Sequence, residues 1–77
     1  MKAKIINKKV QGFIGDAWLV KLNNKYFVVS GVDAVFSGWE VLVFKSDKYG
    51  VVNDFIEVAG GRGITHEEAI KELEGKE

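Results

Sequence analysis

The sequence contains no cysteine and no proline, and only one of its 77 residues is a histidine. Without cysteine, the chain has neither a disulfide framework nor a thiolate-based zinc site. No apolar run approaches the roughly 20 residues that span a bilayer, and no signal-peptide core follows Met1. We therefore expect a cytoplasmic protein that neither enters a membrane nor is secreted.

The composition is typical of one small globular domain, which we place at residues 1–77. Hydrophobic residues make up 47% and charged residues 29%, an ordinary ratio for a folded chain. The formal net charge is zero, but residues 1–25 carry six lysines against one acid, and residues 26–77 carry five bases against ten acids. The basic half can attract the acidic half, other copies or nucleic acid. We do not expect nucleic acid as a partner. Lys2 and Lys4 occupy alternate positions, which is typical of the solvent-facing side of an edge strand.

Strand patterns fill the chain up to about residue 59, with β-branched and aromatic residues between turn signals. Asn23-Asn24 predicts a tight hairpin, because asparagine tolerates the left-handed conformation, and Asp47 to Gly50 predicts a β-turn. The expected strands are residues 2–11, 17–22, 26–30, 39–45 and 51–59. In the last of these, Val52, Ile56 and Val58 should share a face.

A helical pattern follows Gly63. Thr65-His66-Glu67-Glu68 predicts a capping box, with Ile64 and Ala69 at the flanking staple positions, and Gly75 is expected to end the helix. The predicted fold is therefore α+β: a twisted antiparallel sheet of four to five strands with one C-terminal helix packed on a face.

Few residues are suited to catalysis. His66 is expected to be an exposed residue of the first helical turn, and no serine lies in a nucleophile-elbow context. The carboxylates are spread over turns and helix without the clustering that a hard metal ion needs. We expect neither an enzyme nor a metal or cofactor site.

A glycine-rich stretch offers a candidate phosphate site between the last strand and the helix. Backbone amides at Gly60, Gly61 and Gly63 could form a concave nest, and the Arg62 guanidinium is suited to phosphate. The start of the helix at Thr65 would add positive potential. A plain flexible connector is the alternative, and it is slightly favoured. Trp39 or Trp18 would stack on a base if the phosphate belonged to a nucleotide.

The segment from Ser30 to Trp39 has to connect two strands, yet it is unusually apolar. It carries Val32, Val35, Phe36 and Trp39. Either these side chains fold back over the thin core, or they form an interface with another copy or a target protein. We expect the chain to be a homo-oligomer.

The run from Tyr26 to Leu73 resembles a group of very small phage-encoded proteins. The shared pattern is F-S-G-x-E-x-L-V-F, then an acidic-Gly turn, then G-G-x-G before E-E-A. The resemblance implies an inhibitor of host immunity that acts in the host cytoplasm, either by sequestering a nucleotide signal or by occluding a defence enzyme.

The leading functional hypothesis is a non-catalytic phage anti-defence protein that sequesters a phosphorylated small molecule, such as a cyclic-nucleotide immune signal. The alternative is a protein–protein inhibitor of a host defence complex, similar to an anti-CRISPR, that acts through residues 30–39 and an acidic surface. A virion accessory is a third possibility.

Overall fold

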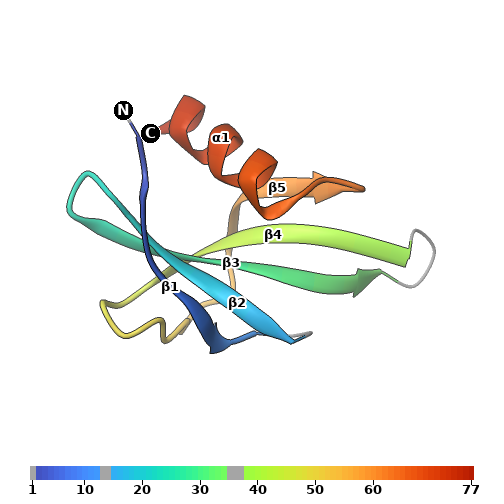
Figure 1. The fold of residues 1–77 in the computed structure, drawn as a ribbon, viewed down its shortest axis with the longest axis horizontal. Helices are drawn as coiled ribbons and strands as arrows, with labels where there is room; N and C mark the ends of the chain where they lie inside the picture. Colours follow the sequence, from blue (N-terminus) through green and yellow to red (C-terminus); the bar gives the residue numbers. More distant parts are fainter. Residues whose placement is uncertain (1, 13–14, 35–37) are drawn as a thin grey trace.

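The fold, taken from a computed structural model, is an open five-stranded antiparallel sheet with one helix (Figure 1). The structure describes residues 2–12, 15–34 and 38–77. The strands follow one another across the sheet in chain order, β1-β2-β3-β4-β5. This arrangement confirms the α+β prediction. The elements are β1 (Lys4–Gln11), β2 (Asp16–Leu22), β3 (Lys25–Ala34), β4 (Gly38–Ser46), β5 (Glu57–Arg62) and α1 (His66–Lys76).

The local signals at the β2–β3 turn and at the helix start are confirmed. Asn23 and Asn24 have φ angles of 53° and 64°, and the turn brings Leu22 opposite Lys25. Thr65 Oγ1 accepts from the Glu68 amide at 3.1 Å, while the Glu68 carboxylate accepts from the Thr65 amide at 2.9 Å. This is the predicted capping box.

The expected end of the helix at Gly75 is wrong, because α1 continues to Lys76. Gly75 does not adopt the left-handed conformation of a C-terminal cap. Instead, the Glu77 amide donates to the Leu73 carbonyl at 3.0 Å, and Lys76 pairs with Glu72 one turn earlier at 3.1 Å. These bonds hold the last turn closed.

The alternation of the strands gives the sheet two apolar faces. One face carries the main core, in which side chains of β2 to β5 pack against Ala69, Ile70 and Leu73 of α1. The sheet side of this core consists of Val20, Leu22, Phe27, Val29, Val41, Val43 and Ala59. Residues between these on the strands point to the other face, where Ala17, Leu19 and Val28 are covered by Val52 and not by the helix. Figure 1 shows α1 lying across only one face.

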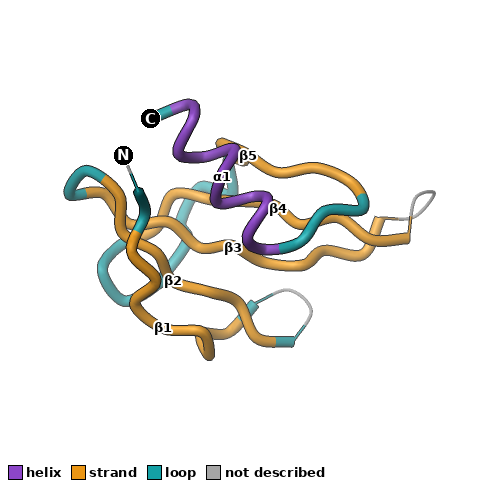
Figure 2. Tube along the Cα trace, turned by 45° about the horizontal axis from the view of Figure 1, so that its top comes forward, coloured by secondary structure: helices purple, strands orange, loops and turns teal. Residues whose placement is uncertain are grey.

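Two segments fold differently from the sequence-based expectation. Residues 30–39 are not mainly a connection, because β3 continues to Ala34 and β4 begins at Gly38 in register with it. The predicted strand 51–59 is also wrong for its first part: residues 47–56 form an irregular connection, and β5 begins only at Glu57 (Figure 2). Asp47 explains the difference, since its Oδ1 accepts from the Tyr49 and Val51 amides at 2.8 and 3.0 Å. Amides held by this side chain are not available to a strand ladder.

The three apolar residues expected on one face of the 51–59 strand have separate environments. Val52 packs on the face without the helix, and Val58 packs against the helix-side core. Ile56 is 65% exposed. The change from irregular chain to strand at Glu57 breaks the period-two alternation that the prediction assumed.

The first and last segments of the structure are joined. The Ala3 amide donates to Glu74 Oε2 at 2.6 Å, and Lys25 pairs with Glu77 at 3.3 Å. In the part of the chain that is described, no helix has the length and apolar character needed to cross a membrane.

Candidate functional site

His66 is not the exposed residue that the sequence predicted. It is half-buried, and its ring lies 4.9 Å from the Trp18 ring, centroid to centroid. Among the described residues, His66 Nε2 is a buried side-chain atom without a hydrogen-bond partner. Burial lowers the pKa of His66 from its ordinary value, and the charge of Glu67 opposes this shift in part. The imidazole therefore favours the neutral form and acts as a packing group against Trp18.

Trp18 already has two partners. Besides His66, the Lys8 ammonium lies 4.6 Å from the centroid of its ring, a cation–π distance. A nucleotide base that stacked on this indole would compete with one of these contacts. The contacts of Trp18 with His66 and Lys8 would therefore compete with the base stacking predicted for it.

The predicted glycine-rich connector is largely a strand. Gly60, Gly61 and Arg62 belong to β5 and stand opposite Leu42, Val41 and Glu40 of β4, and the Gly63 amide donates to the Trp39 carbonyl at 3.2 Å. Gly60 has φ 121°, and a Cβ there would collide with the Val41 carbonyl oxygen. Gly63 has φ 65°. The backbone conformation alone explains glycine at positions 60 and 63.

The two other phosphate-site candidates are also engaged. Arg62 Nε lies 3.9 Å from Glu40 Oε1, with the side chain 73% exposed, which is a weak surface ion pair. Thr65 Oγ1 is occupied by the helix cap. The structure therefore brings Gly60, Gly61, Arg62, Gly63 and Thr65 to neighbouring positions, but several of their donors and acceptors are already paired within the chain.

Two of the four predicted interface residues, Val32 and Trp39, lie along the β3–β4 ribbon. Val32 is half-buried in β3, and Trp39, at the start of β4, is 42% exposed. The Trp39 indole lies over Gly31, where a Cβ would stand 2.5 Å from its Cζ2 and Cη2 atoms. Part of the Trp39 side chain therefore packs within the sheet and is not available to a partner. Val35 and Phe36 lie outside the described residues.

The described residues include a further group of exposed apolar side chains, which the sequence did not single out as a site. Tyr49, Val51, Phe55 and Ile56 are 72, 52, 57 and 65% exposed, respectively. All four lie in the connection 47–56, which we call the apolar loop. Because Val52 of the same loop packs on Ala17, Leu19 and Val28, the apolar loop lies on the face opposite α1. The sequence-based interpretation missed this loop because it assigned the apolar residues of 51–59 to a regular strand.

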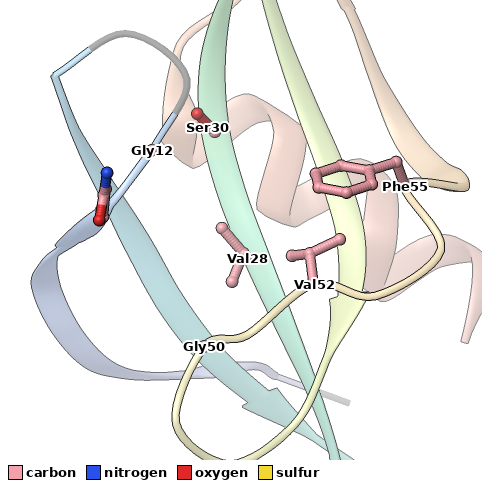
Figure 3. Close-up of a pocket in the computed structure, with 7 residues that line it drawn as sticks. Gly12, Val28, Ser30, Gly50, Val52 and Phe55 are labelled. Carbon is pink, nitrogen blue, oxygen red and sulfur yellow. The ribbon is translucent and has the colours of Figure 1, made fainter.

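A hollow of about 190 Å³ lies between the apolar loop and the sheet, which we call the sheet hollow (Figure 3). Its floor is formed by Val28 and Ser30 of β3, both buried. The remaining lining comes from the end of β1 on one side and the apolar loop on the other. The lining residues are Gln11, Gly12, Val28, Ser30, Gly50, Val52 and Phe55.

Phe55 separates the sheet hollow from a second, more polar hollow. The second hollow, of about 440 Å³, is lined by Lys45, Ser46, Asp47, Asn53, Asp54, Phe55 and Ile56. Phe55 has φ 52°, a conformation that costs an L-residue roughly 1–2 kcal/mol. Its ring stands edge-on to Phe44 with centroids 6.2 Å apart. A strained aromatic residue that remains 57% exposed is more typical of a binding surface than of a core.

These groups offer a surface that is suited to recognition by contact. Within the described part of the chain, no three His, Asp or Glu side chains gather closely enough to hold a metal ion. The apolar loop and the two hollows offer apolar surface bordered by charges of both signs. Comparison of the chain with protein-family models, with curated proteins and with solved structures gave no match.

Proposed function

We propose that this protein is a non-catalytic inhibitor that acts by protein–protein contact, with the apolar loop as its principal binding surface. The observation that carries the proposal is the exposure of Tyr49, Val51, Phe55 and Ile56 within eight successive residues. Large exposed apolar groups next to one another mark interaction sites more often than ordinary surface. Aromatic side chains are also the groups that most often dominate binding energies at such sites.

The hypothesis of nucleotide sequestration has less support. Its phosphate site requires free amides at Gly61 and Gly63, but the Gly63 amide donates to the Trp39 carbonyl. Its cation, Arg62, lies beside Glu40, whose negative charge opposes a phosphate. For these reasons we favour protein binding, with the apolar loop in place of the residues 30–39 and the acidic surface expected from the sequence. We keep the phage anti-defence setting that the sequence resemblance implies.

The two mechanisms make opposite predictions for infection assays. The test uses bacterial strains that each carry one defence system, and a phage that this system restricts. Expression of the unmodified chain should raise the plating efficiency in the strain whose defence it inhibits. The double variant Tyr49→Ser/Ile56→Ser should lower that effect at least about tenfold, because it removes apolar contact without emptying the core.

Arg62→Ala is the matched control. The protein-binding mechanism predicts that this variant retains inhibition, whereas nucleotide sequestration predicts that it loses inhibition. Retained activity in Tyr49→Ser/Ile56→Ser together with lost activity in Arg62→Ala would overturn the proposal. Thermal unfolding of both variants separates loss of binding from loss of the fold.

A further inference from the structure

The sheet hollow has the size of a single apolar side chain. Its volume is about 190 Å³. An engineered apolar cavity of about 150 Å³ is sufficient to bind benzene, so the hollow has room for one aromatic ring or one branched aliphatic group. It is too small for a nucleotide or a typical cofactor, which occupy pockets of roughly 300–1,000 Å³.

The lining of the sheet hollow favours an uncharged occupant. Among the described residues that line it, none carries a formal charge. Val28, Val52 and Phe55 provide apolar contact. Figure 3 shows Val52 and Phe55 on one side of the hollow and Gly12 on the other, with Ser30 of the floor between them. A charged group placed here would lose its hydration without gaining an ionic partner among the lining residues.

The shape of the hollow depends on residues that have no side chain. Gly50 has φ 86°, a backbone conformation that residues with a side chain rarely adopt, and it lies against the Val10 side chain. A Cβ at Gly12 would stand 2.7 Å from Ser30 Oγ. Phe55, which lies in the same loop as Gly50 and across the hollow from Gly12, has a left-handed backbone that fixes the position of its ring. The hollow is thus bounded by constrained backbone on both sides and by the buried sheet below.

The surroundings of the hollow favour a protein over a free small molecule. Tyr49, Val51 and Ile56 are exposed apolar residues of the same loop that supplies Val52 and Phe55 to the lining. A free ligand of ring size would leave these three side chains in water, whereas a protein surface would cover them together with the hollow. A pocket that takes one side chain, inside a rim that excludes water, is the usual arrangement of a binding hot spot.

We infer that the sheet hollow is an anchor pocket, which receives one uncharged aromatic or branched aliphatic side chain of the protein partner. The inference rests on the proposed function and deepens it, since it names the chemistry of the partner's central contact. Phe55 is the specificity-determining wall, because it lies between the anchor pocket and the second, more polar hollow. In that second hollow, Lys45, Asp47 and Asp54 can contact charged residues that flank the partner's anchor side chain.

Capped amino acids test the pocket without knowledge of the partner. The probes are N-acetyl-leucinamide and N-acetyl-phenylalaninamide, with N-acetyl-glycinamide as the control that lacks a side chain. The readout is the NMR signal of the Val28 methyl groups during titration. We expect saturable shifts with the two apolar probes at concentrations on the order of millimolar, and none with the glycine probe.

Two pairs of variants locate the binding event. Val52→Phe should fill the hollow and abolish the shifts, whereas Val51→Phe, at a neighbouring residue outside the lining, should retain them. Phe55→Ala should weaken binding by removing one wall, whereas Ile56→Ala, which lines only the second hollow, should not. Absence of saturable shifts, equal shifts with the glycine probe, or full binding by Val52→Phe would each overturn the inference.

The infection assay distinguishes failure of the anchor pocket from failure of the proposed function. If Tyr49→Ser/Ile56→Ser abolishes inhibition while folded Val52→Phe retains it, the apolar loop binds the partner but the hollow is not the anchor. If Val52→Phe abolishes inhibition and Val51→Phe retains it, the anchor pocket is supported in the intact system.

Discussion

The contact between Trp39 and Gly31 gives a quantitative test of how the projecting β3–β4 ribbon is stabilised. The Trp39 side chain is 42% exposed, so somewhat more than half of it is covered. A buried aromatic side chain removes up to about 250 Å² from water at about 25 cal/mol per Å², so covering half of that area contributes about 3 kcal/mol at most. Residual burial in the unfolded chain lowers the expected contribution to about 2 kcal/mol.

Replacing Gly31 by alanine should displace the indole, because the new Cβ would stand 2.5 Å from two ring atoms. We expect Gly31→Ala and Trp39→Ala each to lower the free energy of unfolding by about 2 kcal/mol, equivalent to roughly 8–16 °C in Tm for a domain of this size. The double variant should be no less stable than Trp39→Ala alone, since the steric conflict is absent without the indole.

Urea unfolding of the four proteins measures the coupling energy between the two positions, which we expect to be about 2 kcal/mol. Gly61→Ala is the control, because a Cβ there meets nothing closer than the Ile64 Cδ1 at 4.0 Å. Its effect should add to that of Trp39→Ala. Additive effects for Gly31→Ala and Trp39→Ala, within about 0.5 kcal/mol, would refute the claim that the ring packs on Gly31.

Three further predictions concern the helix and the glycines. Thr65→Ala should lower the free energy of unfolding by about 1 kcal/mol, measured in urea, because the Glu68 amide loses its acceptor. The pKa of His66 is lower in the folded chain than its ordinary value of 6.5, so the unfolded chain binds the proton more readily. Stability should therefore rise with pH up to about 6.5 and decline as the pH falls below it, and His66→Gln should reduce this slope in urea titrations at several pH values. Gly60→Ala should destabilise strongly through collision with the Val41 carbonyl, whereas Gly75→Ala, in the helix with open space around it, should stabilise by up to about 1 kcal/mol; equal effects in thermal unfolding would contradict the assigned backbone roles.

Features set by neighbouring residues could be predicted from the sequence. The Asn23-Asn24 turn and the Thr65–Glu68 capping box each depend on bonds or conformations within four residues. The α+β fold class could also be predicted, because the alternation of apolar residues in strands and their spacing in a helix indicate which side chains are buried. These elements agree with the structure because tertiary contacts support the local preference and do not override it.

The remaining differences depend on individual side-chain bonds and on contacts between distant segments. The Asp47 side chain withdraws the Val51 amide from a strand, and no pattern of apolar residues reports such a bond. Gly60 looks like part of a flexible loop in the sequence, but its close approach to Val41 explains why a strand needs glycine there. The sheet hollow combines the end of β1, the middle of β3 and the apolar loop, so its existence follows only from the packing of three separated segments.

The order of the strands has a consequence for how the chain reaches its native state. Each strand pairs with the strands that adjoin it in sequence, and the β2–β3 connection is only two residues long. Such a meander forms through short loop closures, which have a low entropic cost and give fast folding for a β-rich chain. The bond between Ala3 and Glu74 is different, since it joins positions 71 residues apart and requires the helix to be docked already. We therefore expect the clasp between the two ends of the chain to form late in folding and to open early in unfolding.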